Sequence, residues 1–305
     1  MTTALAVAKY RFRMVAASEI VLPEYKGSAF HGGFGHALRK IAPSWYRHLF
    51  EPGPPGNGPP HTASPPGNAW PKPFVLLPPL DEEHRYPKDH PFECELTLFG
   101  PAIQYYPICH AALEYLGATL GLGENRGKFR VDGVDIARID PAAVGSAPID
   151  HAISSTEIAS ARQGVNTRRL ALHYVTRLRL KAGNRLHREA PPFPMFLARL
   201  LGRLNTLANL YGDGELIQHP QRSELQQRAE QITIEQHDTC WDDWSRYSGR
   251  QKEWMKFGGL LGSVTYVGDM APFLPWLALG EWVHVGGKSS FGFGKYEITP
   301  DHQPA

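Results

Sequence analysis

The stretch GGKSSFGFGKYEI (residues 286–298) leads from a glycine-rich turn into a short alternating pattern that predicts a strand. A similar segment occurs in the first half of the chain, where GLGENRGKFRV (residues 121–131) also leads from glycines into a strand pattern. Recurrence of one segment at the end of each half indicates that the chain contains one structural unit twice, although glycine-rich turns also recur by chance. The elements that precede the two segments should then follow the same order.

The first half begins with AKYRFRMV (residues 8–15), in which apolar and basic side chains alternate. In a strand, Tyr10, Phe12 and Met14 would face the core, and Arg11 and Arg13 would face outward. The pattern therefore predicts a half-buried strand with a basic outer face. That face has two interpretations, because outward arginines either contact a polyanion or are simply solvated.

The elements expected after this strand follow the order helix, strands, helix, strand. The glycine-rich helix AFHGGFGHALRKI begins at Ser28 and ends before Pro43, and its glycines indicate a close approach to its backbone. The later elements are FVLL (74–77), FECELTLF (92–99), a helix over 101–119, and GKFRVDGVDIARI (127–139). Residues 52–78 are dense in proline and glycine and predict a mobile loop, with the FVLL strand near its C-terminal end.

The second half shows the same order of elements. RLALHYVTRLRLK (169–181) predicts a strand, with Arg177, Arg179 and Lys181 on one face. PMFLARLLGRLNTLANLYG (194–212) is an amphipathic helix. GGLLGSVTYVG (258–268), PFLPWLALGEWV (272–283) and FGFGKYEI (291–298) predict a strand, a helix and a final strand. Residues 213–240 are polar and predict no definite element.

These patterns together predict an α+β protein of tandem ferredoxin-like (RRM-like) βαββαβ domains with a C-terminal glycine-rich loop. The expected bounds are 1–140 for the N-terminal domain, 141–166 for a linker and 167–305 for the C-terminal domain. The C-terminal domain includes the glycine-rich loop over 285–295. This loop is the strongest local signal in the sequence.

Composition excludes several classes of protein. The 305 residues are 42% hydrophobic and 20% charged, as in a soluble globular chain. There is no run of eighteen apolar residues and no signal-peptide pattern at the start, and three scattered cysteines favour neither disulfides nor a cysteine zinc site. We therefore expect a cytoplasmic, reduced protein. The net charge of +2 leaves out the 14 histidines, so the chain becomes more cationic below neutral pH.

The loop over 285–295 has the composition of a phosphate-binding loop. Exposed backbone N–H groups beside lysines can hold phosphates, although such a loop can also serve only to turn the chain. A nucleotide-binding P-loop is excluded, because Trp282 stands where that motif needs a glycine and a strand follows instead of a helix. The residues expected to bind are Gly286, Gly287, Lys288, Ser289, Ser290, Gly292, Gly294 and Lys295.

Four histidines are candidates for chemistry near neutral pH. His31 and His36 lie on the glycine-rich helix, His48 lies just after it, and His284 directly precedes the loop. The spacing in HGGFGH places its two histidines on different faces of a helix, and no HExxH motif or paired acidic metal site occurs. Histidine without a metal suits general acid–base catalysis, although any single histidine is more often structural.

Several motifs resemble the CRISPR pre-crRNA processing endoribonucleases, the sixth Cas family within the RAMP superfamily. The C-terminal signature is RYSGRQ (246–251) and VTYVGDMAPFLPWL (264–277), followed by the glycine-rich loop. YKGSAFHGGFGHALRK (25–40), LRLKAGNRL (178–186) and PPFPMFLARLLGRLN (191–205) are similar to the same family. The glycine-rich loop alone is shared by many RAMP proteins, so the combination is what makes the resemblance specific.

The resemblance implies binding of CRISPR repeat RNA and one metal-independent cut per repeat, with no cofactor. The upstream 2′-hydroxyl would attack the phosphate, giving a 2′,3′-cyclic phosphate and a 5′-hydroxyl. The family's usual catalytic histidine lies in or just after the first helix, which implies His36 first, His48 second and His31 third. His284 fits the motif before the loop, as a catalytic or a structural residue. Arg39 is a further RNA-binding candidate beside Arg177, Arg179 and Lys181.

One departure from the family concerns metal binding. Many relatives carry a cysteine cluster after the GHALR helix, but IAPSWYRHLFEP (41–52) contains no cysteine, so we expect no zinc. Other Cas proteins of an effector complex are expected partners, and a membrane is not. Two alternatives to the nuclease remain open. One is a non-catalytic RAMP subunit that binds crRNA in an effector complex, and the other is a small-molecule enzyme with a phosphate-binding loop.

Overall fold

The computed structural model describes residues 5–53, 70–137, 152–161, 167–243, 245–248 and 253–299. The chain forms two compact units that are discontinuous in sequence. The first holds the chain up to Ser155 together with Thr206–Gly214 and Ser290–Gly292. The second holds Thr156–Asn205, Glu215–Ser289 and the chain from Phe293 onward. The tip of the glycine-rich loop therefore belongs to the first unit.

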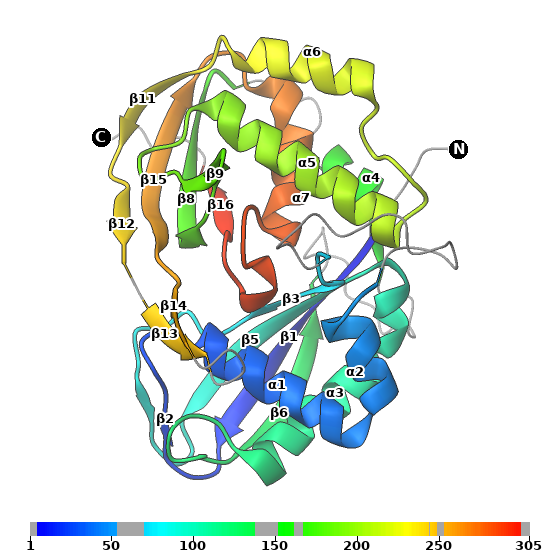
Figure 1. Cartoon of the computed structure of the whole chain (residues 1–305), viewed down its shortest axis with the longest axis vertical. Helices are drawn as coiled ribbons and strands as arrows, with labels where there is room; N and C mark the ends of the chain where they lie inside the picture. The colour runs from blue at the N-terminus through cyan, green and yellow to red at the C-terminus, as the bar shows by residue number, and fades with distance from the viewer. Residues whose placement is uncertain are drawn as a thin grey trace. The chain divides into compact units, whose positions relative to one another are not determined.

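An antiparallel sheet in the order β3-β5-β1-β6 forms the first unit. Its strands are β1 (Ala6–Ala16), β3 (Phe74–Leu77), β5 (Pro91–Phe99) and β6 (Phe129–Ile136). Helix α1 (Gly27–Ile41) follows β1, and α3 (Tyr106–Tyr115) follows β5. Both helices pack against one face of the sheet (Figure 1). This order and pairing is the βαββαβ arrangement of a ferredoxin-like fold.

Shorter elements complete the first unit. They are β2 (Ile20–Val21), α2 (Pro43–Phe50), β4 (Arg85–Tyr86), η1 (Gly100–Tyr105), η2 (Leu116–Leu120) and β7 (Ile153–Ser154). Strand β7 pairs with β1, and α4 (Ser155–Ser160) follows it, so both lie within the stretch expected to be a linker.

Buried and exposed side chains alternate along β1 as the sequence pattern predicts. Tyr10, Phe12 and Met14 are buried in the core of the first unit, whereas Arg11 and Arg13 are exposed. The outer face of the sheet is not uniformly basic. Arg11 donates a 3.0 Å hydrogen bond to Glu95, and Arg13 lies 3.3 Å from Asp135. Carboxylates on the neighbouring strands therefore offset the charge expected to attract a polyanion there.

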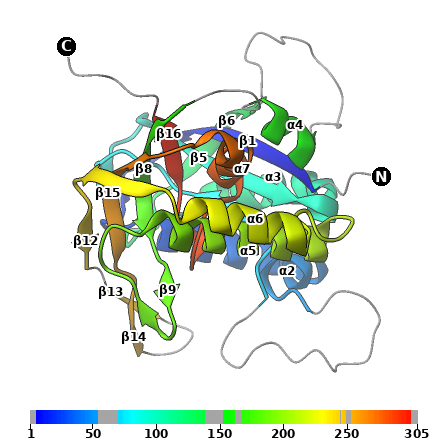
Figure 2. The same cartoon turned by 90° about the horizontal axis from the view of Figure 1, so that it is seen from above.

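A sheet in the order β11-β15-β8-β16 forms the second unit and repeats the topology of the first. Its strands are β8 (Arg169–Leu178), β11 (Thr233–His237), β15 (Gly259–Val267) and β16 (Tyr296–Thr299). The two helices of the repeat are α5 (Phe193–Tyr211) and α7 (Leu274–Val283). Strands β11 and β12 (Cys240–Asp242) both run along β15 (Figure 2). The expected tandem ferredoxin-like fold is confirmed.

Other elements of the second unit are β9 (Lys181–Ala182), β10 (Arg185–Leu186), α6 (His219–Ala229), β13 (Ser245–Ser248), β14 (Glu253–Lys256) and η3 (Ala271–Phe273). The short helix η4 (Ser289–Phe291) forms the tip of the glycine-rich loop, and two of its three residues belong to the first unit. Helix α6 and strands β11 and β12 occupy the polar stretch 213–240, for which the sequence predicted no element. Most of the predicted mobile loop and linker, at 54–69, 138–151 and 162–166, lies outside the described residues. No helix within the described ranges is long and apolar enough to span a membrane.

Candidate functional site

Helix α1 places His36 at the surface of the first unit. Phe30, Phe34 and Leu38 recur at four-residue intervals and are fully buried, so they fix which side of the helix faces the core. His36 lies outside this apolar stripe and is exposed. Gly33 lets α1 approach η2 closely, because a Cβ atom at this position would lie 2.9 Å from a methyl group of Leu116. The close approach expected from the glycines of this helix is thus observed.

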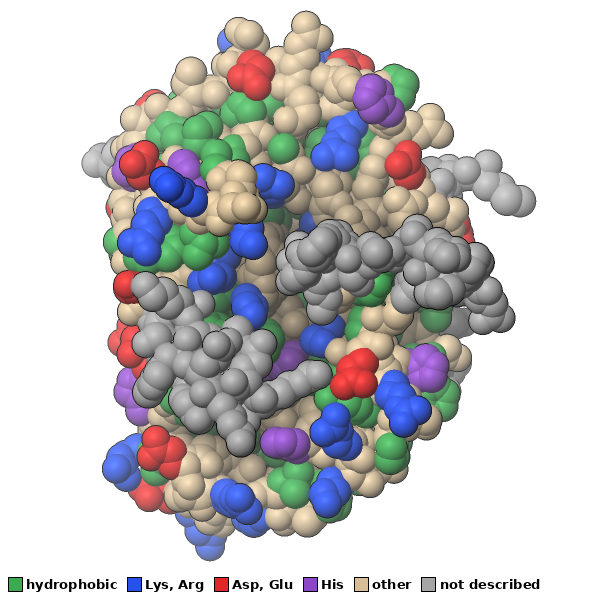
Figure 3. All heavy atoms as spheres, viewed as in Figure 1, with side chains coloured by type: hydrophobic (Ala, Val, Ile, Leu, Met, Phe, Trp, Pro, Cys, Tyr) green, Lys and Arg blue, Asp and Glu red, His purple; other side chains and the backbone are tan. Residues whose placement is uncertain are grey.

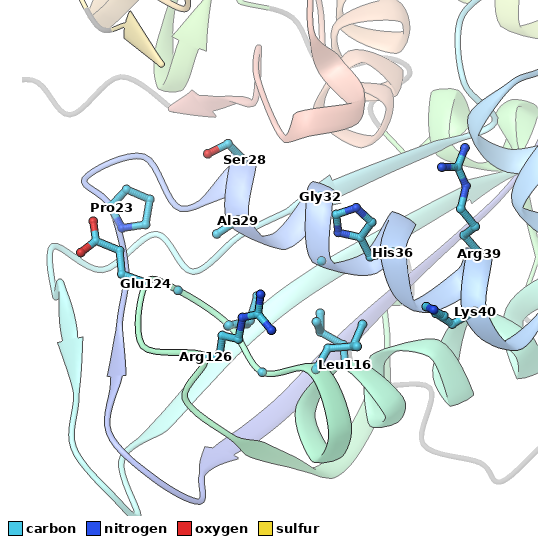
Figure 4. A pocket seen from close by; sticks show the side chains of 15 residues that line it. Pro23, Ser28, Ala29, Gly32, His36, Arg39, Lys40, Leu116, Glu124 and Arg126 are labelled. Atoms are coloured by element: carbon cyan, nitrogen blue, oxygen red, sulfur yellow. The ribbon is translucent and has the colours of Figure 1, made fainter. Parts of the chain in front are cut away.

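A cavity of about 630 Å³ lies beside this part of α1. His36, Arg39 and Lys40 border it from the helix, and Arg126 borders it from the turn between η2 and β6 (Figure 4). The other lining residues are Pro23, Ser28, Ala29, Gly32, Gly33, Leu116, Leu120, Gly121, Leu122, Gly123 and Glu124. The cavity therefore joins one imidazole with three cationic side chains. Figure 3 shows Lys, Arg and His side chains on the part of the visible face that holds α1.

Among the described residues, one of the three cationic side chains around the cavity has an acidic partner and the other two do not. Arg39 lies 3.8 Å from Glu51, and its guanidinium is 4.6 Å from the centre of the Tyr46 ring. For Lys40 and Arg126, the described part of the chain provides no ion pair. Arg126 has a backbone φ of 51°, and the carbonyl of Gly123 accepts a hydrogen bond from its N–H. A bound anion would thus find positive charge from both α1 and the facing turn.

His48 lies on α2, which begins directly after α1 at Pro43. The side chain is exposed, and its Nδ1 is 2.9 Å from the carbonyl oxygen of Ser44, one turn earlier in the helix. Its ring lies 5.6 Å from that of Trp45 and 6.1 Å from that of Tyr105. His48 is absent from the lining of the cavity that contains His36.

His284 has the environment of a structural residue. It is 2% exposed, and its Nδ1 lies 3.1 Å from the carbonyl oxygen of Phe293. The backbone carbonyl of His284 accepts a 2.9 Å hydrogen bond from Arg203 Nε. These contacts place His284 at the base of the glycine-rich loop, where it joins the two ends of the loop within the second unit.

His31 is buried on the inner side of α1. Its ring stacks on Phe291 from the loop tip, with centroids 3.7 Å apart and planes at 15°. The hydroxyl of Tyr25 donates a hydrogen bond to the carbonyl of the same Phe291. Both contacts lie inside the first unit and hold the loop tip against the start of α1.

The glycine-rich loop is compact. Gly292 and Gly294 have φ values of 87° and 72°, and a Cβ atom on Gly294 would lie 1.8 Å from the carbonyl oxygen of Val285. Gly287 donates its N–H to the carbonyl of Arg179 at 2.9 Å, so this amide is already used within the fold. Lys288 has a φ of 68°, and its Nζ lies 5.0 Å from the Phe257 ring centre.

Other RNA-binding candidates of the loop are less exposed than expected. Lys295 is half-buried and lies 3.5 Å from Glu297. The hydroxyl of buried Ser289 donates a 2.9 Å hydrogen bond to the carbonyl of Gly286. Gly286, Gly292 and Ser290 also lie within the described loop, whose middle residues Ser289–Phe291 form the short helix η4.

Arg177, Arg179 and Lys181, which were predicted to share one basic face, lie in three different environments. Arg177 is 7% exposed and forms an ion pair with Asp242 of β12. Arg179 donates a hydrogen bond to the carbonyl of Gly258, and burial lowers the pKa of its guanidinium. Lys181 on β9 is exposed. The three side chains therefore do not present one uniform basic surface.

Metal-ligating side chains do not gather in the described residues, where no group of three or more His, Cys, Asp or Glu is placed to hold an ion. Cys94 and Cys109 are buried, and Cys240 is exposed. Burial raises the pKa of the Cys109 thiol to about 12.

Two family models match the chain, one in each half. Residues 171–296 match "CRISPR-associated endoribonuclease Cas6", and residues 5–150 match an N-terminal domain named AF_1859_N. An uncharacterized protein of Archaeoglobus fulgidus is 25% identical over 91% of this chain and 92% of its own length. The resemblance seen in the motifs is therefore confirmed.

Solved structures share the fold over nearly the whole chain. Thermus thermophilus Cas6 is 15% identical with a TM-score of 0.62, covering 97% of this chain and 99% of its own. A Cas6 product complex is 17% identical with a TM-score of 0.63, covering 96% and 100%. A chain of a partial Cas6-RT-Cas1–Cas2 complex is 15% identical with a TM-score of 0.64, and the match covers 99% of this chain and 47% of that one.

Proposed function

We propose that this chain, which matches the Cas6 family model over residues 171–296, binds CRISPR repeat RNA and cuts it within each repeat. The cut proceeds without a metal ion. A base removes the proton of the 2′-hydroxyl, and the 2′-oxygen attacks the adjacent phosphorus. The bond from phosphorus to the 5′-oxygen breaks, and an acid protonates that oxygen. The products carry a 2′,3′-cyclic phosphate and a 5′-hydroxyl.

The observation that carries this proposal is the cavity bordered by His36, Arg39, Lys40 and Arg126. An imidazole can accept or donate the proton that the reaction moves. Cations beside it stabilise the negative charge that develops on the phosphate oxygens in the transition state. Its volume of about 630 Å³ is typical of a small-ligand pocket, which is enough for a nucleotide and its phosphate.

His36 is our choice for the proton-transfer residue. It is the histidine that borders the cavity and is exposed to a substrate. His48 is the second choice because it is exposed on the next helix, outside the cavity lining. His284 and His31 are buried, which favours structural roles for both.

Arg126 is our choice for the cation on the phosphate. It lies on the turn that faces α1, and no carboxylate in the described ranges pairs with it. A guanidinium can donate two parallel hydrogen bonds to phosphate oxygens. Arg126 and Lys40 were not among the residues predicted from the sequence. The available signal was the basic residue within GLGENRG (121–127), next to the glycines that open this turn.

The glycine-rich loop contributes RNA binding in this proposal. Lys288 and Lys295 contact phosphates, and the amides from Gly286 to Ser290 assist, except that of Gly287. Relatives with this fold have been solved as a product complex and as a substrate mimic complex. Another has been solved with a reverse transcriptase, Cas1 and Cas2, so we include other Cas proteins among the partners. Arg39 of the first unit and Lys181 of the second unit are further RNA contacts in this proposal.

The direct test is to incubate the purified chain with a repeat RNA from its own CRISPR array in the presence of EDTA. We expect a single cut per repeat, a 5′-hydroxyl on the downstream product and a cyclic phosphate on the upstream product. A strict requirement for Mg²⁺ or Mn²⁺, or a product with a 3′-hydroxyl, would refute the mechanism.

The alternative function is that of a non-catalytic RAMP subunit that binds crRNA. The ion pair of Arg177 and the compact loop suit either role, but the open cavity around His36 favours cleavage. Tight binding of repeat RNA without any cut, under conditions in which the RNA folds correctly, would favour the alternative.

A further inference from the structure

Three aromatic rings from two elements meet at the surface beside α1. Trp45 and His48 belong to α2, and Tyr105 ends η1. The Trp45 ring centre lies 4.5 Å from that of Tyr105 and 5.6 Å from that of His48. We call these three residues the aromatic cluster.

Exposure of Trp45 is unusual among the described residues. Trp45 is 39% exposed, and within the described ranges the one other exposed large hydrophobic residue is Leu80 at 47%. The buried residues of α2 are Leu49 and Phe50, so Trp45 is not needed to anchor the helix. The Trp45 ring is tilted by 45–46° to the His48 and Tyr105 rings, so neither ring stacks flat on it and an exposed face can receive a flat ligand.

Arginines lie on the helix that carries Trp45 and His48 and on the helix before it. Arg47 is exposed on the same helix as Trp45 and His48. Arg39 lies over the ring of Tyr46, the residue after Trp45, with its Cζ 4.6 Å from the ring centre. Aromatic rings interleaved with arginines suit a nucleic acid, because the rings stack on bases and the arginines contact phosphates.

Arg39 also connects α2, the helix that carries Trp45 and His48, to the cavity. The same side chain borders the cavity and lies 3.5 Å from the hydroxyl of Tyr46. An RNA strand with one phosphate in the cavity would therefore have a neighbouring nucleotide close to α2.

We propose that the aromatic cluster binds an unpaired base of the RNA by stacking on Trp45, outside the cavity. This inference rests on the proposed binding of repeat RNA and adds a second contact to it. His48 acts in this view as part of a stacking surface, with its ring orientation fixed by the carbonyl of Ser44. Stacking tolerates any base, so the contact adds affinity more than sequence specificity.

The test measures dissociation constants of Trp45→Ala, Trp45→Phe and Leu80→Ala for repeat RNA and for single-base abasic versions of it. We expect Trp45→Ala to weaken binding of the intact RNA by about 5- to 150-fold. Trp45→Phe should retain most of the affinity, and the exposed apolar control Leu80→Ala should behave as wild type. One abasic position should weaken wild type by a similar factor and leave Trp45→Ala unchanged.

Several results would overturn the inference. These are unchanged affinity of Trp45→Ala, a loss matched by Leu80→Ala, or a loss that no abasic position reproduces. A lowered melting temperature that accounts for the weaker binding would assign Trp45 to the fold. If wild type binds the RNA without cutting it, the proposed cleavage is refuted, and the same dissociation constants still decide whether Trp45 stacks on a base. Absence of any RNA binding by wild type would refute both, and a protein partner for the cluster would then be the remaining interpretation.

Discussion

Replacement of His36 by alanine should separate the rate of cleavage from stability and RNA affinity. A positioned general acid or base contributes roughly 10²–10⁴-fold to a rate, which corresponds to about 3–5 kcal/mol of transition-state stabilisation. The His36 side chain is exposed on α1 and outside its apolar stripe. Its removal should therefore change the free energy of unfolding by no more than about 0.5 kcal/mol.

The assay is single-turnover cleavage with protein in excess over labelled repeat RNA, together with the dissociation constant and the unfolding curve of each variant. His84→Ala is the matched control, because His84 is also an exposed histidine of the first unit and lies outside the cavity. We expect His36→Ala to cleave about 10²–10⁴-fold more slowly with nearly unchanged affinity, and His84→Ala to match wild type.

Buried histidines should respond in the opposite way. His31→Ala removes a ring stacked at 3.7 Å on Phe291, so we expect a loss of stability of about 2–5 kcal/mol, as for other large buried side chains. The bound fraction of this variant should still cut at close to the wild-type rate. If His36→Ala cuts within a fewfold of wild type while His48→Ala is slow, the assignment to the cavity is wrong. If neither is slow, histidine does not move the proton.

Arg126→Ala should lower the single-turnover rate by about 10²-fold, as for loss of one transition-state donor, and Arg126→Lys should recover part of it; equal rates for all three proteins would remove Arg126 from the site. Lys288→Ala should weaken RNA binding and reduce the slope of log affinity against log salt by about 0.7–0.9, whereas an unchanged slope would show that Lys288 contacts no phosphate. For Asp81, burial raises the pKa, but hydrogen bonds from Lys26 and Tyr86 and the Lys26 charge outweigh it and lower the pKa overall. A carboxylate whose pKa is lower in the folded state stabilises the fold at pH values above its unfolded-state pKa, and this stabilisation is lost as the pH falls. In urea unfolding, wild type should therefore lose stability below about pH 4, and Asp81→Asn should lose less. Equal losses in the two proteins would contradict the pairing of Asp81 with Lys26.

Much of the fold could be predicted from local sequence patterns. The alternation of apolar and polar residues in β1 and β8 is a strong signal of structure, as are the apolar stripes of α1 and α5. Each of these elements buries one face, which makes its pattern regular. Helix α2 was missed because Pro43 was interpreted only as the end of α1, whereas proline is also favoured at the first position of a helix. Helix α6 has only Leu225 and Ala229 buried, so it carries little periodic apolar signal.

Site residues were harder to predict because their roles depend on contacts across the fold. The outward arginines of β1 meet Glu95 and Asp135 only through the register of neighbouring strands, which local alternation does not specify. The pairing of Arg177 with Asp242 likewise depends on β12 lying beside β15. Arg126 is about ninety residues from His36 along the chain, and only packing of the η2–β6 turn beside α1 brings both to one cavity.

The most direct test of the central claim is cleavage of a repeat RNA that carries a single 2′-deoxy nucleotide immediately upstream of the cut. The proposed reaction needs that 2′-hydroxyl as its nucleophile. We predict that wild-type protein binds this RNA with nearly unchanged affinity and does not cut it, while a 2′-deoxy nucleotide one position further upstream leaves cleavage intact. A cut at the original position in the 2′-deoxy RNA would contradict the account.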